Sequence, residues 1–212
     1  MIAIIDYRAG NLTSVQRALN HLGWESVITH DYSRVMEAER IIFPGVGAAG
    51  RAMHNLREMG LDLALREACQ EGKPILGICL GTQIVMDWSE ENHTRCLGLV
   101  KGTVRRFPAS LKDQKGNSLK IPHMGWNGAE LKYPHPLFDG LSPESEFYFV
   151  HSYYPEPEDP GEILCVTEYG ISFASVVAKK NLVAVQFHME KSGRPGLRIL
   201  SNFCKWDGRD HA

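Results

Sequence analysis

One cysteine lies between two glycines in a pattern that suits nucleophilic chemistry. The short apolar run at residues 74–78 leads into Cys79, with Gly77 two residues before it and Gly81 two residues after it. Small residues at these two positions let neighbouring backbone approach a sharp strand-to-helix turn, as in the G-x-S-x-G nucleophile elbow. We therefore predict that Cys79 is a nucleophile, with sulfur in place of the serine oxygen.

The predicted turn also supplies polar groups to this sulfur. A helix that begins directly after Cys79 has unpaired N–H groups at its start, which favour an anion there. The N–H of Leu80 is the nearest of them and could donate a hydrogen bond to an oxyanion. The alternative interpretation is that Cys79 is a small core residue, as many free cysteines are.

An imidazole that could serve this cysteine follows a second apolar run. His188 comes directly after residues 183–187, and Glu190 stands two residues further on. A cysteine nucleophile needs an imidazole that takes and returns a proton, and the imidazole needs a carboxylate that orients it. We predict that Cys79, His188 and Glu190 form a catalytic triad. The alternative is that His188 is a surface histidine without a catalytic role.

A glycine-rich segment, residues 45–50, matches the dinucleotide-binding pattern G-x-G-x-x-G. That fingerprint belongs to the first strand-to-helix turn and needs an acidic residue at the end of the next strand. Here the next acidic candidates, Glu67 and Glu71, fall within a predicted helix. We therefore favour the interpretation that Gly45 and Gly47 provide flexible backbone beside the elbow, and we expect no cofactor.

The composition excludes several other classes of protein. The 212 residues are 43% hydrophobic and 23% charged, with a net charge of -2, so no basic field attracts nucleic acid. Five scattered cysteines without a C-x-x-C pair indicate neither a disulfide framework nor a zinc cluster. The nine histidines include no H-E-x-x-H motif, so we expect no metal. Without a basic leader or a membrane-length apolar run, we expect a cytoplasmic protein with no membrane partner.

The N-terminal half predicts a parallel sheet that would position these side chains. Its strands are expected at residues 1–6, 26–28, 40–43 and 74–78, and its helices at 11–22, 49–58, 61–71 and 83–88. Alternating strands and helices give right-handed crossovers, and ligands of such sheets bind beyond the carboxyl ends of the strands.

After residue 88 the pattern changes to short strands separated by turns. These strands are expected at residues 99–107, 118–121, 128–131, 146–150, 163–169, 173–178 and 182–187, with a turn-rich segment at 123–127 and a closing helix at 194–206. Because no repeat or linker is present, we predict one α/β domain over residues 1–212. Its N-terminal half has parallel β-α units, and its C-terminal half is β-rich and mixed.

Two segments around the predicted triad resemble the paired signatures of the class I (triad) glutamine amidotransferases. They are residues 77–83 (GICLGTQ) and 186–190 (QFHME). Residues 122–127 (PHMGWN) and 148–153 (YFVHSY) are similar to segments of the glutaminase subunits of imidazole glycerol phosphate synthases. The resemblance extends from residue 4 to the C-terminal helix, and it implies a flavodoxin-like sheet with a nucleophile elbow.

The resemblance implies that glutamine is hydrolysed to glutamate and ammonia. The consumer of the ammonia would be a separate (β/α)8-barrel cyclase subunit, bound as a heterodimer partner. That subunit makes imidazole glycerol phosphate and an aminoimidazole carboxamide ribotide, which is a step of histidine biosynthesis. The isolated chain is then expected to be nearly inactive until its partner arranges the backbone that binds the oxyanion.

The resemblance also implies roles for residues outside the triad. The oxyanion and substrate positions are Gly45, Val46, Gly47, Leu80, Gln83, Ser152 and Tyr153. The positions at the junction with the partner are Asn11, Met124, Trp126, Tyr148 and Lys191.

The sequence departs from the family pattern at two positions. Thr82 stands where the family usually has methionine, and Met189 stands where it usually has proline. A proline would stiffen the link between His188 and Glu190 through its fixed φ. Three alternatives stay open: a paralogous glutaminase that feeds another synthase, a cysteine peptidase or other acyl hydrolase on the same elbow, and a non-enzymatic binding module.

Overall fold

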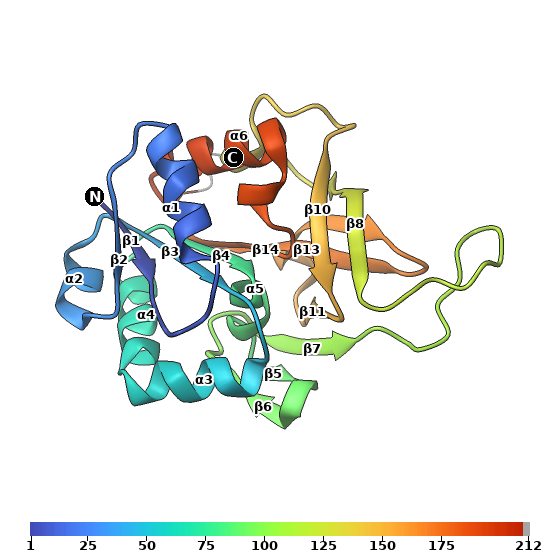
Figure 1. Ribbon diagram of the computed structural model, residues 1–212, viewed down its shortest axis with the longest axis horizontal. Coiled ribbons are helices and arrows are strands. Elements are labelled where there is room, and N and C mark those ends of the chain that lie inside the picture. The colour runs from blue at the N-terminus through green and yellow to red at the C-terminus, as the bar shows by residue number, and fades with distance from the viewer. Residues whose placement is uncertain (210–212) are drawn as a thin grey trace.

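The computed structural model describes residues 1–209 and has an eight-stranded sheet at its centre (Figure 1). The strand order is β2 (Ser26–Thr29), β1 (Ile2–Ile5), β3 (Arg40–Gly45), β4 (Ile75–Cys79), β14 (Leu182–Val185), β13 (Ser172–Lys179), β12 (Ile163–Glu168) and β9 (Glu130–Leu131). The strands from β2 to β14 pair in parallel, and the pairs from β14 to β9 are antiparallel. The predicted fold class, with a parallel first half and a mixed second half, is confirmed.

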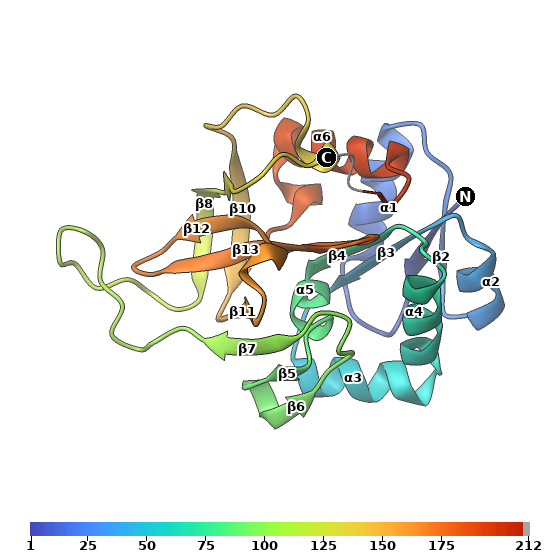
Figure 2. The ribbon, with the colours of Figure 1, turned by 180° about the vertical axis from the view of Figure 1, so that it is seen from behind.

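Helices cover both faces of this sheet, as the two opposite views show (Figures 1 and 2). One face carries α1 (Leu12–His21) and α6 (Gly193–Lys205), and the other carries α3 (Ala49–Glu58) and α4 (Leu61–Gln70). Each face has its own buried cluster. Leu19 of α1 and Phe203 of α6 belong to the first cluster, and Leu56 of α3 and Leu65 of α4 belong to the second. The apolar stripes of the helices are therefore buried against the sheet.

Two smaller sheets lie beside the half of the main sheet that the C-terminal part of the chain forms. One pairs β10 (Glu146–His151) with β8 (His123–Gly128), and the other has the order β11 (Tyr153–Pro157), β7 (Gly102–Arg106), β5 (Trp88–Ser89) and β6 (Thr94–Arg95). The segment between β7 and β8 projects away from the body of the molecule (Figures 1 and 2). Short 3-10 turns lie at Glu91–His93, Pro136–Phe138, Pro160–Glu162 and Met189–Lys191. No helix among residues 1–209 has the length and apolar character needed to cross a membrane.

Three local predictions are wrong. The helix after the elbow, α5, spans Leu80–Ile84 and not 83–88, because the carbonyl of Val85 accepts hydrogen bonds from the backbone of Leu99 and Val100. Residues 118–121 form no strand, since the segment makes only one bridge within its own loop, between Lys112 and Ser118. The turn-rich segment at 123–127 is instead the strand β8, which pairs along its whole length with β10.

One helix was not predicted at all. α2 (Tyr32–Glu37) follows Asp31, whose side chain accepts hydrogen bonds from the backbone N–H groups of Ser33 and Arg34. An aspartate before a short amphipathic segment is a common helix N-cap, so this signal was present in the sequence.

Candidate active site

A sharp turn between β4 and α5 places Cys79 at the carboxyl edge of the sheet. Cys79 has φ 55° and ψ −104°, a backbone conformation that costs free energy for a residue with a side chain. A Cβ at Gly77 would lie 2.8 Å from the Cβ of Ala184, and one at Gly81 would lie 2.1 Å from the carbonyl oxygen of Phe43. Both glycines are therefore required by close packing, and the predicted nucleophile elbow is present.

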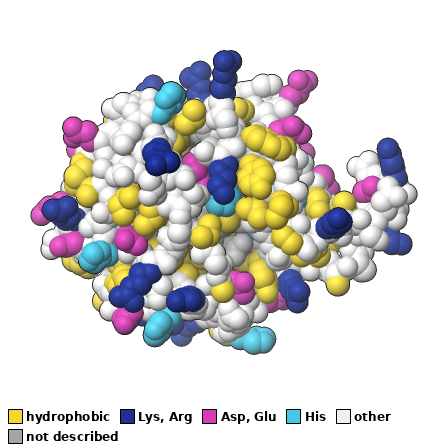
Figure 3. Space-filling model, in the orientation of Figure 1, with side chains coloured by type: hydrophobic (Ala, Val, Ile, Leu, Met, Phe, Trp, Pro, Cys, Tyr) yellow, Lys and Arg dark blue, Asp and Glu magenta, His cyan; other side chains and the backbone are white. Residues whose placement is uncertain are grey.

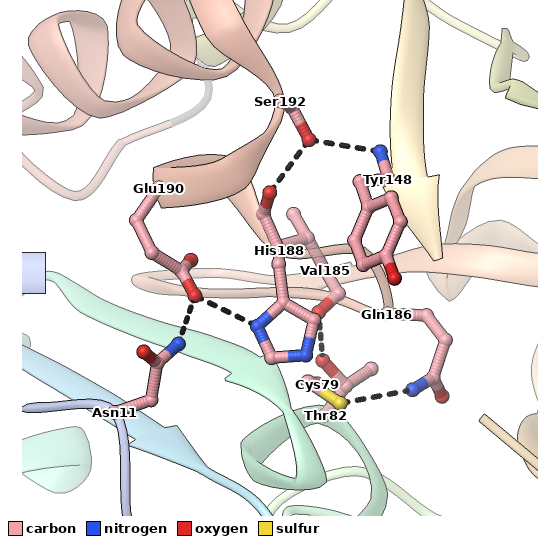
Figure 4. Close-up of polar contacts among 9 residues, drawn as sticks. All are labelled: Asn11, Cys79, Thr82, Tyr148, Val185, Gln186, His188, Glu190 and Ser192. Carbon is pink, nitrogen blue, oxygen red and sulfur yellow. Dashed lines mark hydrogen bonds and ion pairs between the residues drawn. The ribbon is translucent and has the colours of Figure 1, made fainter. Parts of the chain in front are cut away.

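His188 and Glu190 lie beside this elbow, because β14 runs parallel to β4 and ends next to it. The Nδ1 of His188 is 2.8 Å from Oε1 of Glu190, and both side chains are buried. The other ring nitrogen, Nε2, lies toward the sulfur of Cys79 (Figure 4). The structure thus brings the three predicted triad residues together, with the imidazole between the carboxylate and the sulfur.

The short turn Met189–Lys191 holds the carboxylate in place without a proline. The Met189 side chain is buried in the core. The hydroxyl of Ser192 donates to the carbonyl oxygen of His188 at 2.6 Å and accepts from the backbone N–H of Tyr148 at 3.0 Å (Figure 4). The Nδ2 of Asn11 donates to the same Glu190 oxygen that His188 uses. Hydrogen bonds on both sides of the turn thus restrict its movement.

The surroundings of His188 favour its protonated form. Burial by itself lowers the pKa of His188, but the negative charge of the nearby Cys79 and the hydrogen bond and charge of Glu190 outweigh it and raise the pKa to about 10. The imidazole therefore carries a proton at neutral pH, which it can donate to a leaving group.

A hollow of about 380 Å³ opens next to the sulfur and contains most of the predicted substrate positions. It is lined by Val46, Gly47, Cys79, Leu80, Gln83, Glu91, Pro122, Val150, His151, Ser152, Tyr153 and His188. Gly45 is not in the lining, but it stands opposite Cys79 in the pairing of β3 with β4. The predicted oxyanion and substrate residues therefore lie within one small region, although residues 45 and 153 are far apart in the chain.

The end of β3 is packed against a buried tyrosine that the sequence analysis missed. A Cβ at Gly45 would lie 1.8 Å from the hydroxyl oxygen of Tyr7, so only glycine fits there. Burial, and then the nearby charge of Cys79, raise the pKa of Tyr7 above its ordinary value, so the phenol stays neutral. Gly47 has φ 104°, a conformation that glycine adopts readily.

The dinucleotide interpretation of residues 45–50 fits poorly with these contacts. A pyrophosphate would need the free N–H groups at the start of α3. The backbone N–H of Ala49 instead donates to Oε2 of Glu91 at 2.7 Å, and a Cβ at Gly50 would lie 3.2 Å from the Cβ of Asn92. A carboxylate of the chain itself thus occupies the position that a phosphate would take. Among residues 1–209, no cluster of three or more His, Cys, Asp or Glu side chains could hold a metal ion.

A buried pair of histidines supports the part of the hollow that Tyr153 lines, and the sequence did not predict it. The Nδ1 of His151 is 2.8 Å from the carbonyl oxygen of Tyr153, so Nδ1 must be the donor. The Nε2 of His151 then accepts from Nδ1 of His123, 3.1 Å away. Burial lowers the pKa of His151 to about 3 and that of His123 to about 4, so both rings are neutral at pH 7. The pair fixes the carbonyl of Tyr153 at the edge of the hollow.

Of the five predicted junction residues, Asn11 donates to Glu190, Tyr148 accepts from the backbone N–H of His188, and Lys191 follows Glu190 in the chain. Met124 and Trp126 on β8 are 60% and 54% exposed, which is unusual for large apolar side chains. The rings of Trp126 and Tyr148 are 6.1 Å apart, and the Lys191 ammonium is 5.9 Å from the centre of the Tyr148 ring. Figure 3 shows apolar side chains gathered over β8 and β10. With Asn11, these residues form what we term the junction surface.

Known proteins resemble this chain over almost its whole length. A family model described as "Glutamine amidotransferase class-I" matches residues 3–206. The chain belongs to this family. The resemblance of residues 77–83 and 186–190 to the signatures of the class I glutamine amidotransferases is therefore confirmed, and so is the fold expected of that family.

Two curated relatives of this amidotransferase carry the same name, imidazole glycerol phosphate synthase subunit HisH. The protein from Desulfovibrio desulfuricans is 53% identical over 206 residues, which cover 97% of this chain and 94% of the relative. The protein from Methylococcus capsulatus is 48% identical over 210 residues, which cover 97% and 96%.

Solved structures share the fold of this amidotransferase at low sequence identity. One described as "Crystal structure of glutamine amidotransferase" has a TM-score of 0.73 at 19% identity and covers 96% of this chain and 100% of its own. The structure of PurLQS from Thermotoga maritima has a TM-score of 0.73 at 16% identity and covers 96% and 97%. At these identities the likeness concerns the fold alone.

Proposed function

We propose that this glutamine amidotransferase is the glutaminase subunit of an imidazole glycerol phosphate synthase in histidine biosynthesis. The observation that carries the proposal is the placement of Cys79, His188 and Glu190 around one hollow, with the imidazole between the carboxylate and the sulfur. The names of the relatives support the choice of synthase.

In the first half of the reaction, the Cys79 thiolate attacks the side-chain amide carbon of glutamine. The carbonyl electron pair moves onto oxygen, and the oxyanion is bound by the N–H of Leu80 and by backbone N–H groups of residues 45–47. His188 donates its Nε2 proton to the amide nitrogen, which leaves as ammonia. A γ-glutamyl thioester on Cys79 remains.

In the second half, neutral His188 takes a proton from water, and the resulting hydroxide attacks the thioester. The carbon–sulfur bond breaks, glutamate leaves, and sulfur keeps the electron pair beside the reprotonated imidazole. Glu190 orients the ring throughout through the 2.8 Å contact with Nδ1. No step requires a metal or an organic cofactor.

We also propose that Ser152, Tyr153 and Gln83 hold the α-amino and carboxylate groups of glutamine. The two hydrogens on Nε2 of Gln83 are directed at the carbonyl of Tyr153, at 3.1 Å, and at Oε1 of Gln186, at 3.3 Å. The side-chain oxygen of Gln83 is therefore available as an acceptor, and an amide oxygen can accept a hydrogen bond from the α-ammonium group of the substrate.

The partner in this proposal is a (β/α)8-barrel cyclase subunit, which binds the junction surface and receives the ammonia. Large exposed apolar and aromatic side chains such as Met124 and Trp126 are typical of the centre of an interface. Asn11 links this surface to the triad directly, because its amide donates to Glu190. Partner binding can thus act on the triad as well as on the glycines of residues 45–47.

The replacement Cys79→Ala tests the chemistry. We expect glutaminase activity to fall to background in the complex with the cyclase and its ribonucleotide substrate, with the fold intact by circular dichroism. Cys69→Ala is the control, because Cys69 is half-buried, far from the hollow, and is expected to keep activity. Substantial hydrolysis by Cys79→Ala would contradict the proposed nucleophile.

The same assay tests which synthase receives the ammonia and whether binding of that partner activates glutamine hydrolysis. We expect turnover of glutamine by the chain alone to be at least about tenfold lower than in the complex. Equal turnover with and without the cyclase would contradict partner control, and activation by a different synthase would identify a paralogous client. Cleavage of peptides or simple esters at a comparable rate would instead favour an acyl hydrolase.

A further inference from the structure

The side chain of Gln186 points at the catalytic sulfur from a different direction than the imidazole (Figure 4). Its Nε2 is 3.9 Å from Sγ of Cys79, which is within hydrogen-bond range for a sulfur acceptor. Gln186 is fully buried, and its backbone N–H donates to the carbonyl of Ser175 at 2.8 Å. This hydrogen bond restrains the backbone from which the side chain extends.

The orientation of this amide follows from its neighbours. The Nε2 of Gln83 is 3.1 Å from the carbonyl oxygen of Tyr153, which can only accept, so this end of Gln83 must be the donor. The same Nε2 is 3.3 Å from Oε1 of Gln186. The oxygen of Gln186 therefore faces Gln83, and its NH₂ group faces the sulfur. The reverse orientation would oppose two NH₂ groups and place an oxygen against a thiolate.

We propose that Gln186 is a further catalytic residue, which donates a hydrogen bond to the sulfur of Cys79 and stabilises it as an anion. The proposal rests on the proposed function of Cys79. An amide does not titrate, so Gln186 stabilises the charge without giving up a proton. The hydrogen bond strengthens whenever charge is on sulfur, both before attack and when the thioester breaks and sulfur regains its electron pair.

The effect of Gln186 on the sulfur can be measured separately from that of the other polar groups around it. Those groups are His188 with Glu190 at the end of β14, the buried phenol of Tyr7 after β1, and His151, Tyr153 and Glu91 in the lining of the hollow. The replacement Gln186→Met keeps the length and volume of the side chain and removes the donor, and it changes none of these groups.

The test is the rate at which iodoacetamide alkylates Cys79 in the full chain as a function of pH. With Gln186→Met we expect the midpoint of the alkylation profile to move to higher pH, so that alkylation slows up to about tenfold at pH values below the wild-type midpoint. We also expect kcat for glutamine in the complex to fall with little change in KM, because the contact is to sulfur and not to substrate.

A matched control is available on the same pair of elements. The hydroxyl of Thr82 on α5 donates to the carbonyl of Val185 at the end of β14 at 2.5 Å, and no dashed line joins it to the sulfur in Figure 4. Thr82→Val removes a buried hydrogen bond and should leave the alkylation profile unchanged. A folded Gln186→Met variant with the wild-type profile would overturn the proposal.

A second measurement uses the wild-type chain and tests the proposal even if the Gln186→Met variant does not fold. In the wild-type chain, the side-chain ¹⁵NH₂ signals of Gln186 should shift when Cys79 is alkylated, whereas unshifted signals would overturn the proposal. The proposed function can fail independently of this proposal. If Cys79→Ala still hydrolyses glutamine, Cys79 is not the nucleophile. The alkylation profile of the chain with Cys79 would still show whether Gln186 contacts the sulfur.

Discussion

Glu190 holds the imidazole by one oxygen that also accepts from the amide of Asn11. The other oxygen, Oε2, is buried and has no hydrogen-bond partner among residues 1–209. The charge is therefore concentrated on the side that faces His188, which is the group it must orient. The methionine at position 189 does not loosen this arrangement, because its side chain is buried and Ser192 holds the backbone of His188.

The buried histidine pair gives a prediction for stability. The pKa of His151 is about 3 in the folded chain and about 6.5 in the unfolded chain. Between these values the unfolded state binds the proton and the folded state does not, so the free energy of unfolding falls as pH decreases. We expect His151 to account for about 2 kcal/mol of the stability lost between pH 7 and pH 5.

Urea denaturation at pH 7 and pH 5 measures this effect. His151→Gln should lower stability at pH 7 and also reduce the difference between the two pH values. The control His54→Gln changes an exposed histidine on α3 and should preserve the difference. If His151→Gln and wild type lose the same free energy of unfolding on acidification, the buried neutral pair is not the cause.

At the scale of elements, the elbow depends on contact between backbones. α5 begins so close to the end of β3 that no atom can be added at Gly81 without meeting the carbonyl of Phe43. This contact fixes the angle at which Cys79 emerges from β4, since β3 and β4 are paired up to Cys79 itself. The elbow is thus a property of three elements together, β3, β4 and α5.

Gly81→Ala should therefore destabilise the chain by about 3 kcal/mol, because the clash is with backbone and cannot be relieved by a rotamer change. Thermal denaturation with a fluorescence or circular dichroism signal measures the loss. Gly128→Ala is the control, because a Cβ at Gly128 has no neighbour within 4 Å. Similar stability for the two variants would contradict the packing argument.

At the scale of the whole molecule, the hollow and the junction surface are adjacent. β10 contributes to both, since Val150 lines the hollow and Tyr148 packs against Trp126. His123 and Met124 are neighbours on β8, one buried against His151 and the other exposed on the junction surface. A partner that covers this surface therefore contacts the same strands that support the hollow.

Trp126→Ala should weaken association with the cyclase about 30-fold, as expected for a large aromatic residue at the centre of an interface. Isothermal titration calorimetry with the purified cyclase measures the change in Kd. Trp88→Ala provides a comparison, because Trp88 is 39% exposed but lies on β5, outside the junction surface. If both replacements weaken binding equally, or if neither weakens it, the partner does not bind at the junction surface.

Local patterns were sufficient for the elbow and for the alternation of strands and helices in the first half. Gly77 and Gly81 are separated from Cys79 by one residue each, and the apolar run before them has the length of a buried strand. The strand β8 could not be predicted in this way. Its residues do not alternate, and they form a strand because β10, more than 15 residues later, pairs with them.

The sequence by itself determined the family, the elbow and the identity of the residues expected to react, because short motifs with required glycines encode them. Only the tertiary structure decided how those residues are supported. The contact of Gln186 with sulfur joins residues 107 positions apart, and that of His123 with His151 joins residues 28 apart. Such contacts depend on which strands pair in the sheets, and the pairing results from packing of the whole chain rather than from local residue patterns.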